Sequence, residues 1–515
     1  MTSTTPAVHK GVNATLALIF LGMAASIQGS DPNIASTALL SAGKDLQFGG
    51  LDALAASVST LVLAATVIST GMLADRLGRK KVLFAGMLLA VIGDGLVSIS
   101  QDPWMYIGGR AIAGIAMGIL YGASFAYVSF FAQGSKGGIA VALGVFGAAT
   151  GLFGLIFTFV GSAMVGVGWR EAFLVVPVLS LLALVLGIFI LPGDHKGQKE
   201  TAPWDALGQI LLGLAVVGTL YGISHAADSL ISPLTYGPVL LGVVFFVLFY
   251  FRERSKSDQR FFPIALLKSP LFLAAIGVGF LYNFATGVGF LSFSNLFQYQ
   301  LDLKGLSLSL SQLPYMLLGI PVTLIVGKII SKNILTRQMS TFIGAWVTAA
   351  GAVLFAITAL SSPKSVWDYM PALVVLGIGT AIPIVAYGGM ILEEADPKHY
   401  GVVSSSRSTI GQFWYALGLA SSTVVIDLIA RQHVLTKLGS SAESQLNAWS
   451  ATGAKPTDTS VFPAAIDGFA QGFAVLMIAF AIATVLIGFF VLVLANKSDK
   501  QKAAAAKAAT APAQP

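Results

Sequence analysis

The chain has 515 residues, of which 56% are hydrophobic and only 10% are charged, and its mean hydropathy is +0.82. Soluble domains carry about 25% charged residues, so this composition excludes an ordinary water-soluble fold and predicts a protein that lies in a lipid bilayer. The sequence contains no cysteine, which excludes disulfides and thiolate chemistry, and its net charge of +7 comes from short basic loops beside apolar runs rather than from a nucleic-acid-binding patch.

Fourteen apolar stretches are long enough to cross a bilayer, which takes about 20 residues of helix. In chain order they lie near residues 14–40, 51–71, 82–98, 104–131, 137–165, 171–191, 204–225, 232–250, 271–297, 306–330, 340–359, 367–391, 402–429 and 465–495. The sequence therefore predicts an all-α polytopic membrane protein.

Basic residues are unevenly distributed over the loops between these stretches. The two ends of the chain and the loops that follow even-numbered spans carry about threefold more Lys and Arg than the remaining loops. Because cytoplasmic loops are enriched in Lys and Arg, we expect a multi-pass protein of the plasma (inner) membrane with both termini in the cytoplasm.

One connection, between the second and third spans, carries a dense charge cluster. It reads GMLADRLGRKKVL from Gly71 to Leu83, and its charged residues are Asp75, Arg76, Arg79, Lys80 and Lys81. Gly71 and Gly78 are expected to let the backbone turn at either edge of a tight loop. A loop that only sets orientation needs neither the acid nor this glycine spacing.

The segment matches the pattern G-x-L-A-D-R-x-G-R-K-x-x-L and so resembles the loop between spans 2 and 3 of the major facilitator superfamily. The resemblance implies a transporter without cofactor or metal, working as a monomer in the lipid bilayer on a small-molecule substrate. It also implies that Gly71, Asp75, Arg76, Gly78, Arg79 and Lys80 gate the conformational cycle.

The superfamily fold has two six-helix bundles, so fourteen spans imply two extra helices between them. Polar linkers bracket spans 7 and 8, which makes these two the natural extras. The expected organisation is a bundle in 1–193, a linker with two additional spans in 194–268, a second bundle in 269–497 and a disordered cytoplasmic tail in 498–515. Residues 432–463 are expected to form one long outer loop.

Three charged residues fall inside predicted spans, where a charge is costly and therefore suggests function. They are Asp31 in span 1, Asp94 in span 3 and Arg110 in span 4. A rise of about 1.5 Å per residue places all three in the outer half of the membrane. They are candidates for proton coupling, and the alternative is a fixed ion pair that only fastens helices. Gln28 lies on the same face as Asp31, and Pro32 is expected to kink or break the helix.

The segments around Asp31 and Arg110 resemble motifs of fourteen-span drug:proton antiporters. RAIAGIAMG, from Arg110 to Gly118, is similar to their span 4 motif R-x-x-Q-G-x-G, with Ala113 in place of Gln. The resemblance implies that Arg110 takes part in proton coupling. Span 5 departs from the family, because Phe157 and Thr158 stand where its motif has Gly-Pro.

Span 9 carries a stripe of polar and aromatic residues on one face. Its members are Asn283, Thr286, Phe290, Phe293 and Phe297, and Tyr299 closes the stripe. With Gln28 they are candidates to line the substrate cavity. The alternative is that the aromatic residues pack in the core or face lipid.

The sequence has no Walker loop to bind ATP, no Cys/His cluster for zinc and no nucleophile motif, so we do not expect an enzyme. The favoured hypothesis is proton-coupled efflux of hydrophobic or cationic compounds, the multidrug type associated with antibiotic resistance. Asp31 would then exchange protons for substrate. The alternatives are a proton-coupled importer or facilitator of a polar metabolite or anion, and a translocator of lipid or envelope components.

Overall fold

The computed structural model describes residues 13–48, 51–132, 138–193, 205–226, 229, 231–255, 264–303, 305–392, 400–446 and 460–510. Within these residues all regular structure is helical, which confirms the predicted all-α class. Thirteen of the described helical segments are long and apolar enough to cross a membrane, and α2 adds a shorter apolar stretch, Leu54–Val67. Each of the fourteen predicted spans therefore corresponds to a helical segment.

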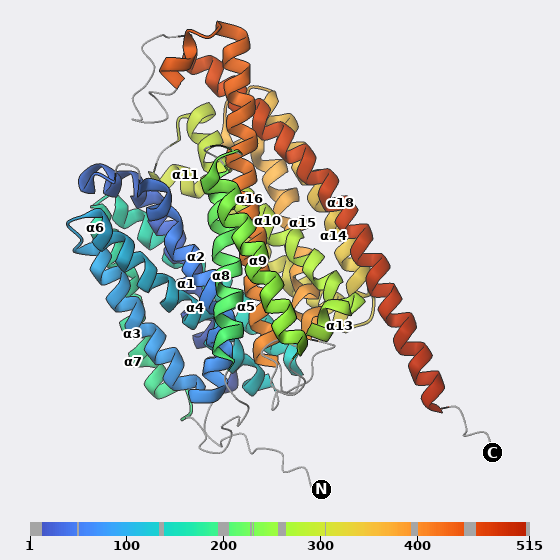
Figure 1. The fold of residues 1–515 in the computed structure, drawn as a ribbon. Coiled ribbons are helices and arrows are strands. Elements are labelled where there is room, and N and C mark those ends of the chain that lie inside the picture. The colour runs from blue at the N-terminus through green and yellow to red at the C-terminus, as the bar shows by residue number, and fades with distance from the viewer. Residues whose placement is uncertain are drawn as a thin grey trace. The chain divides into compact units, whose positions relative to one another are not determined.

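The chain divides into two compact units, drawn together in Figure 1. Unit 1 holds Met1–Tyr221, Gly237–Leu266 and Ile391–Gln412, and unit 2 holds Gly222–Tyr236, Leu267–Met390 and Phe413–Pro515. The first unit contains α1 (Ala14–Leu46), α2 (Asp52–Leu77), α3 (Arg79–Ser98), α4 (Pro103–Ala132), α5 (Gly138–Val165), α6 (Trp169–Phe173), α7 (Val175–Ile190) and most of α8 (Ala206–His225) and α9 (Pro233–Ser255).

After the short 3₁₀ helix η2 (Ile264–Lys268), the second unit begins with α10. Its helices are α10 (Pro270–Leu301), α11 (Gly305–Ser311), α12 (Leu313–Leu317), α13 (Gly319–Ser331), α14 (Arg337–Leu360), most of α15 (Val366–Leu392) and α18 (Val461–Thr510). Helix α16 (Tyr400–Leu438) starts in unit 1 and continues into unit 2. The predicted division at residues 193 and 268 stays a proposal.

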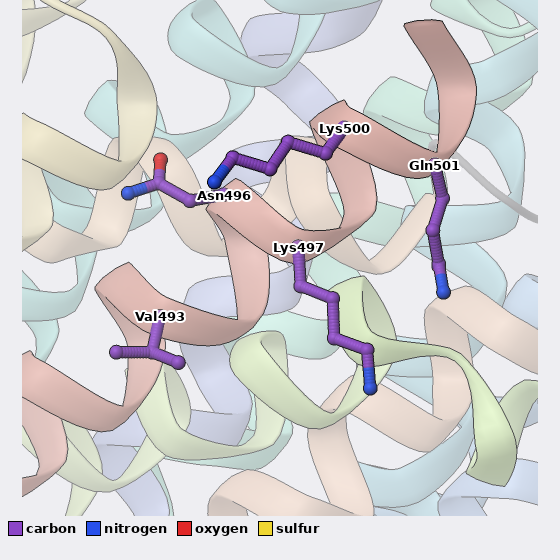
Figure 2. A pocket seen from close by; sticks show the side chains of 5 residues that line it. All are labelled: Val493, Asn496, Lys497, Lys500 and Gln501. Carbon is purple, nitrogen blue, oxygen red and sulfur yellow. The ribbon is translucent and has the colours of Figure 1, made fainter. Parts of the chain in front are cut away.

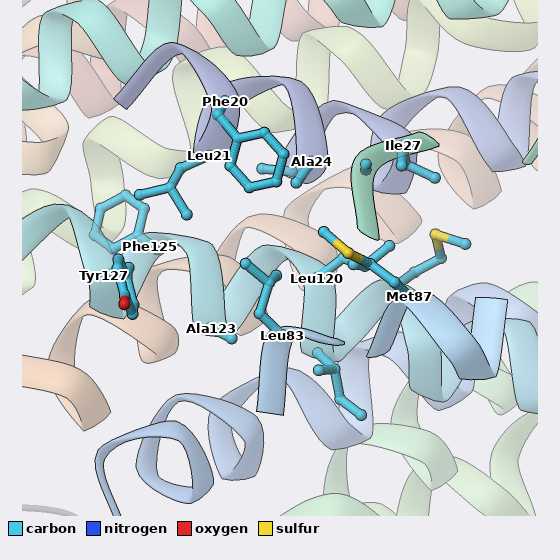
Figure 3. Packing of buried hydrophobic residues seen from close by; sticks show 14 of the residues in the cluster. Phe20, Leu21, Ala24, Ile27, Leu83, Met87, Leu120, Ala123, Phe125 and Tyr127 are labelled. Atoms are coloured by element: carbon cyan, nitrogen blue, oxygen red, sulfur yellow. The ribbon is translucent and has the colours of Figure 1, made fainter. Parts of the chain in front are cut away.

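In the core of unit 1, α4 packs against both α1 and α3. Figure 3 shows side chains of these helices packed together, among them Phe20, Leu21, Ala24, Ile27, Leu83, Met87, Leu120, Ala123, Phe125 and Tyr127. All of these are buried. The packing fixes the rotation of each helix about its axis and so determines which residues point inward.

Two glycines bring neighbouring helices close to α4. A Cβ added to Gly93 of α3 would lie 2.5 Å from the backbone nitrogen of Ala113, and one added to Gly114 of α4 would lie 2.4 Å from the backbone oxygen of Ser59 in α2. Only glycine allows such approaches between helix backbones. The residues beside these contacts, Asp94 on α3 and Ser59 on α2, are thereby carried toward α4.

The core of unit 2 is aromatic. Phe293 of α10 lies 4.5 Å from Phe355 of α14 and 6.0 Å from Phe473 of α18, measured between ring centroids. Helices α14 and α18 pack along each other, and Figure 1 shows α18 as one long helix. Edge-to-face aromatic pairs of this kind stabilise a core beyond the area they bury.

Four local expectations differ from the structure. Helix α1 runs through Pro32, so the predicted break does not occur, and a kink there stays a prediction. Membrane helices tolerate an internal proline when nearby side chains satisfy the freed backbone groups. The tenth span is instead divided into α11, α12 and α13, because Pro314 and Pro321 lack backbone donors.

The other two differences concern the end of the chain. Helix α18 continues through Thr510 where a disordered tail was expected from residue 498, because the Ala- and Lys-rich sequence has high helix propensity. The expected outer loop 432–463 is shorter, since α16 extends to Leu438 and α18 begins at Val461. Residues 447–459 lie outside the described residues.

Candidate functional site

The three charged residues predicted within spans meet in the interior of unit 1. Asp31 comes from α1, Asp94 from α3 and Arg110 from α4, and their side chains are 0%, 0% and 2% exposed. Chain positions up to 79 residues apart thus form one cluster shielded from water. The sequence placed them at similar depth, and the helix packing turns them toward one another.

The two carboxyl groups accept different numbers of hydrogen bonds from Arg110. Arg110 Nη1 donates to Asp31 Oδ1 (2.5 Å) and Nη2 donates to Asp31 Oδ2 (3.0 Å), a bidentate pair. Asp94 receives a single hydrogen bond, from Nη1 to Oδ1 (3.0 Å). Its second oxygen, Oδ2, is buried and has no hydrogen-bond partner among the described residues.

Three further residues surround this cluster, and sequence reasoning missed all of them. Ser59 of α2 accepts a hydrogen bond from Arg110 Nη2 (2.8 Å), and the guanidinium carbon lies 5.3 Å from the ring centroid of Phe173. Tyr106, one turn before Arg110, is buried, and its hydroxyl has no partner among the described residues. The spacing of four from Arg110 was a signal for Tyr106, whereas nothing local marked Ser59.

The charges in this cluster do not balance if both acids are ionised. Two carboxylates and one guanidinium leave a net negative charge in a site without water access, and an uncompensated buried charge costs several kcal/mol. One added proton makes the cluster neutral. The arrangement is therefore suited to holding one proton and to releasing it when the site opens.

Gln28 is half-buried on α1, one turn before Asp31, as its spacing predicts.

A second Asp–Arg pair lies in the same unit, near the end of α1. Asp45 accepts hydrogen bonds from Arg170 Nη1 and from Trp169 Nε1 (3.1 Å), while Arg170 Nη2 donates to the Ser100 oxygen (2.8 Å). The hydrogen bonds from Arg170, and then from Trp169, hold the pKa of Asp45 below its ordinary value.

The segment predicted to gate the cycle is tighter than expected. Gly71 does not form a turn, because it lies within α2, buried against Gly122 of α4. The whole connection between α2 and α3 is Gly78, whose φ of 107° favours glycine. Asp75 and Arg76 therefore sit in the last turn of α2.

Lys80 has a structural contact that the motif did not predict. With Arg79 it lies in the first turn of α3, and its Nζ donates to the backbone oxygens of Ile188 (3.1 Å) and Leu191 (2.7 Å) at the end of α7. Lys80 thus caps a helix whose last carbonyls have no intrahelical partner. Arg76 is half-buried, and the side chain of Asp75 lies outside the described part of the structure.

The residues expected to line the substrate cavity in span 9 do not form one continuous polar face. Asn283 Nδ2 donates to the Gly279 oxygen (2.8 Å) and Thr286 Oγ1 to the Tyr282 oxygen (2.9 Å), both within α10. Both side chains are half-buried. The Tyr299 ring packs against Phe469, 5.1 Å between centroids.

Phe293 belongs to the core of unit 2 rather than to a cavity wall, because it is 1% exposed and surrounded by aromatic rings. The helical spacing that placed it beside Asn283 and Thr286 did not reveal which neighbours cover it. The side chain of Phe290 lies outside the described part of the structure.

An open hollow of about 590 Å³ lies on α18 and is lined by Val493, Asn496, Lys497, Lys500 and Gln501. Figure 2 shows these five side chains. None of the residues predicted to line a substrate cavity contributes to the hollow. Within the residues that the structure describes, there is no group of three or more His, Cys, Asp or Glu side chains able to hold a metal ion.

Comparison with known proteins places this arrangement in a family. A profile described as Major Facilitator Superfamily matches residues 14–419. The multidrug transporter protein MdtP of Bacillus subtilis is 27% identical over 417 residues, which cover 78% of this chain and 73% of that protein. The methylenomycin A resistance protein of Bacillus subtilis is 25% identical, with 72% and 78% covered. The multidrug efflux pump LfrA of Mycolicibacterium smegmatis is 23% identical, with 75% of each covered.

The fold is also that of a solved transporter. The crystal structure of the human organic anion transporter MFSD10 (TETRAN) aligns with a TM-score of 0.60 over 93% of this chain and 99% of that chain, at 14% identity. The family match spans most of the sequence, and the described residues include thirteen helical segments long and apolar enough to cross a membrane. The chain is therefore a multi-pass membrane transporter of the major facilitator superfamily.

Proposed function

We propose that the chain is a secondary active transporter that exports hydrophobic or cationic small molecules in exchange for protons. The observation that carries this proposal is the buried cluster of Asp31, Asp94 and Arg110, whose charges balance only with one added proton. The named relatives support the direction and substrate class, since they are multidrug or antibiotic resistance proteins.

In this mechanism the residues of the cluster bind a proton and compensate the charge that remains. The two carboxyl groups hold a proton while the cluster is closed to water and lose it when the cluster opens. Arg110 keeps the remaining carboxylate compensated, so that a buried negative charge is never left without a cation. Gln28, half-buried one turn from Asp31, is proposed to contact a substrate that approaches the cluster.

The segment from Gly71 to Lys80 is proposed to gate the change between inward-open and outward-open states. The single-residue connection at Gly78 ties the inner ends of α2 and α3, and Lys80 ties α3 to the end of α7. A movement of these ends would therefore be passed to the helices that carry Asp94 and Ser59. Asn283, Thr286, Phe290 and Tyr299 remain proposed contacts for substrate in α10.

A proton-coupled importer or facilitator of a polar metabolite or anion is the second candidate. It is favoured by Phe157 and Thr158 in α5, which replace the Gly-Pro of the antiporter motif. It is also favoured by Arg407, a half-buried cation whose guanidinium lies 5.5 Å from the ring centroid of Phe125.

Proton flux in inside-out membrane vesicles with an acidic lumen separates the two candidates. Lipophilic cations and neutral drugs are added one at a time, and an exporter should dissipate the pH gradient with some of them. Asp31→Asn should abolish this response, whereas Asp467→Asn, an exposed acid of α18, should leave it intact. If no compound in the panel moves protons, or if Asp31→Asn has no effect, antiport through this cluster is wrong, and uptake of metabolites is measured instead.

A further inference from the structure

We infer that the transported proton resides on Asp94, and that Asp31 is the permanent counter-ion of Arg110. This inference rests on the proposed proton-coupled function and reverses the priority that the sequence motif gave to Asp31. It rests on geometry, because Arg110 donates two hydrogen bonds to Asp31 and only one to Asp94.

Asp31 is bound as an anion should be. Each of its oxygens accepts a hydrogen bond from a different nitrogen of Arg110, at 2.5 and 3.0 Å. A bidentate Arg–carboxylate pair is among the strongest polar contacts in proteins and satisfies both charges at once. Protonating Asp31 would break one of these bonds and leave Arg110 less compensated in a site without water.

Asp94 is bound as a neutral acid should be. One oxygen accepts from Arg110 Nη1 at 3.0 Å, while Oδ2 is buried without a donor. An ionised oxygen in that position would be a buried charge without a donor, and burying a neutral, protonated oxygen there costs far less. Asp94 Oδ1 and Asp31 Oδ1 accept from the same nitrogen, Arg110 Nη1, so the two carboxyl groups converge on one donor.

The groups around Asp94 agree with this assignment. Helix α1 contributes the carboxylate of Asp31, and α4 contributes Arg110 and the neutral hydroxyl of Tyr106. Ser59 of α2 and Phe173 of α6, which complete the cluster, are uncharged. Because Asp31 already neutralises Arg110, a proton on Asp94 makes the whole cluster neutral.

The net charge of the cluster is balanced when one proton is exchanged for one singly charged cation. When the cluster opens to water, the O–H bond of Asp94 breaks and the proton leaves on a water molecule, with both electrons staying on Oδ2. The cluster then carries one net negative charge, which favours binding of a singly charged cation. Reprotonation of Asp94 restores neutrality and expels that cation. This assignment therefore favours monovalent cations as the class of compound that couples to protons.

Infrared spectroscopy of the purified full chain tests the assignment without any substrate. The wild type should show the carbonyl stretch of a protonated carboxyl group, which titrates as the pH is raised. The band should shift in frequency in Asp94→Glu, because a protonated Glu absorbs differently from a protonated Asp, and should stay in place in Asp31→Glu and in Asp467→Asn. If the band shifts in Asp31→Glu but not in Asp94→Glu, the proton resides on Asp31 and the inference is overturned.

Transport of tetraphenylphosphonium in vesicles gives a second, functional readout. Asn has the shape of a neutral Asp and can donate to Asp31, so Asp94→Asn should fold but keep the cluster neutral, and we expect it to exchange this cation far more slowly than the wild type in counterflow. It should no longer release protons when the cation is added. If the wild type releases none, the proposed function fails, although the infrared result still stands. If Asp94→Asn releases as many as the wild type, the inference fails.

A separate observation concerns the hollow at the end of α18. The exposed apolar residues of this helix form a stripe whose last members are Ile482, Leu486, Phe490 and Val493. The hollow continues that stripe with Asn496, Lys497, Lys500 and Gln501 (Figure 2). One helix face therefore changes from apolar to cationic over two turns.

We propose that this face binds an anionic phospholipid. An acyl chain fits the apolar stripe, and the phosphate then lies beside Lys497 and Lys500, both exposed. Gln338 of α14 donates to Asp499 (2.6 Å), which places Arg337 and the end of α13 with Lys328 and Lys332 at the same end of unit 2. The local excess of positive charge is what anionic headgroups are attracted to at a membrane surface.

Native mass spectrometry of the full chain tests this with phosphatidylglycerol, phosphatidylcholine and inorganic phosphate as separate probes. Replacing both lysines (Lys497→Gln with Lys500→Gln) should weaken phosphatidylglycerol retention by roughly tenfold. The control, Lys364→Gln with Lys437→Gln, makes the same charge change at exposed positions outside the hollow. Equal loss in the control, or retention of phosphatidylcholine as strong as that of phosphatidylglycerol, would overturn the proposal. Binding of inorganic phosphate alone would show an ion site rather than a lipid site.

Discussion

Helix α1 carries two aspartates that each bind an arginine, and the two pairs lie in different surroundings. Asp31 and Arg110 are 0% and 2% exposed, whereas Asp45 and Arg170 are 48% and 39% exposed. Water screens the second pair, so either partner can be lost at little cost. In the first pair each charge depends on the other, and the additional acid Asp94 makes the pair sensitive to a single proton. Burial, rather than residue type, distinguishes an exposed ion pair from the cluster that we propose binds a proton.

Removal of the two arginines should have the most unequal consequences. Arg110→Gln leaves Asp31 and Asp94 buried without a cation, and breaking a buried pair costs about 3–5 kcal/mol. We expect loss of transport and a large drop in the yield of folded protein, measured by size-exclusion chromatography of a fluorescent fusion. Arg170→Gln should retain most of the transport activity and most of the yield of folded protein. Similar yields for the two variants would contradict the comparison.

The next largest effect on stability and transport is expected from a substitution at Gly93, where α3 lies close to α4. A Cβ at Gly93 would meet the Ala113 backbone at 2.5 Å, whereas one at Gly95 meets nothing within 4 Å. Gly93→Val should push α3 away, cost about 1–3 kcal/mol and separate Asp94 from Arg110. Gly95→Val, the matched control, should transport nearly as well as the wild type. Thermal melting and vesicle transport measure the two effects, and equal behaviour of the two variants would refute the packing argument.

Ser59 should matter less, because it accepts only one of the hydrogen bonds of Arg110. Ser59→Ala removes that acceptor and should destabilise the protein by about 1 kcal/mol. Since the charges of the cluster are unchanged, proton coupling should be retained with a modest loss of rate. An uncoupled Ser59→Ala transporter would mean that Ser59 takes part in the proton step itself.

The smallest effect is expected at Asp45. Its pKa in the folded protein lies below the ordinary value of 3.8, because Arg170 and Trp169 hydrogen-bond the ionised form. The contribution to stability is therefore present above pH 3.8 and is lost as the pH falls through the lowered pKa. Asp45→Asn should melt slightly earlier than the wild type at neutral pH, and the difference should vanish in strong acid. A difference that grows on acidification would have the wrong sign.

The helical class, the fourteen apolar segments and the presence of three charges at similar depth were all predictable from the sequence. These features depend on hydropathy and spacing along one helix, and a rise of about 1.5 Å per residue is enough to estimate depth. The connection at Gly78 was likewise recognisable, because a positive φ favours glycine.

Contacts between helices could not be predicted in this way. Which carboxyl group receives both guanidinium nitrogens depends on how α1 and α3 are rotated against α4, and that rotation is set by packing at Gly93, Gly114 and the surrounding core. The same holds for Lys80, which caps α7, and for Phe293, which lies in the aromatic core instead of a cavity. Periodicity identifies a face of a helix, but only the neighbours in the tertiary structure decide what covers that face.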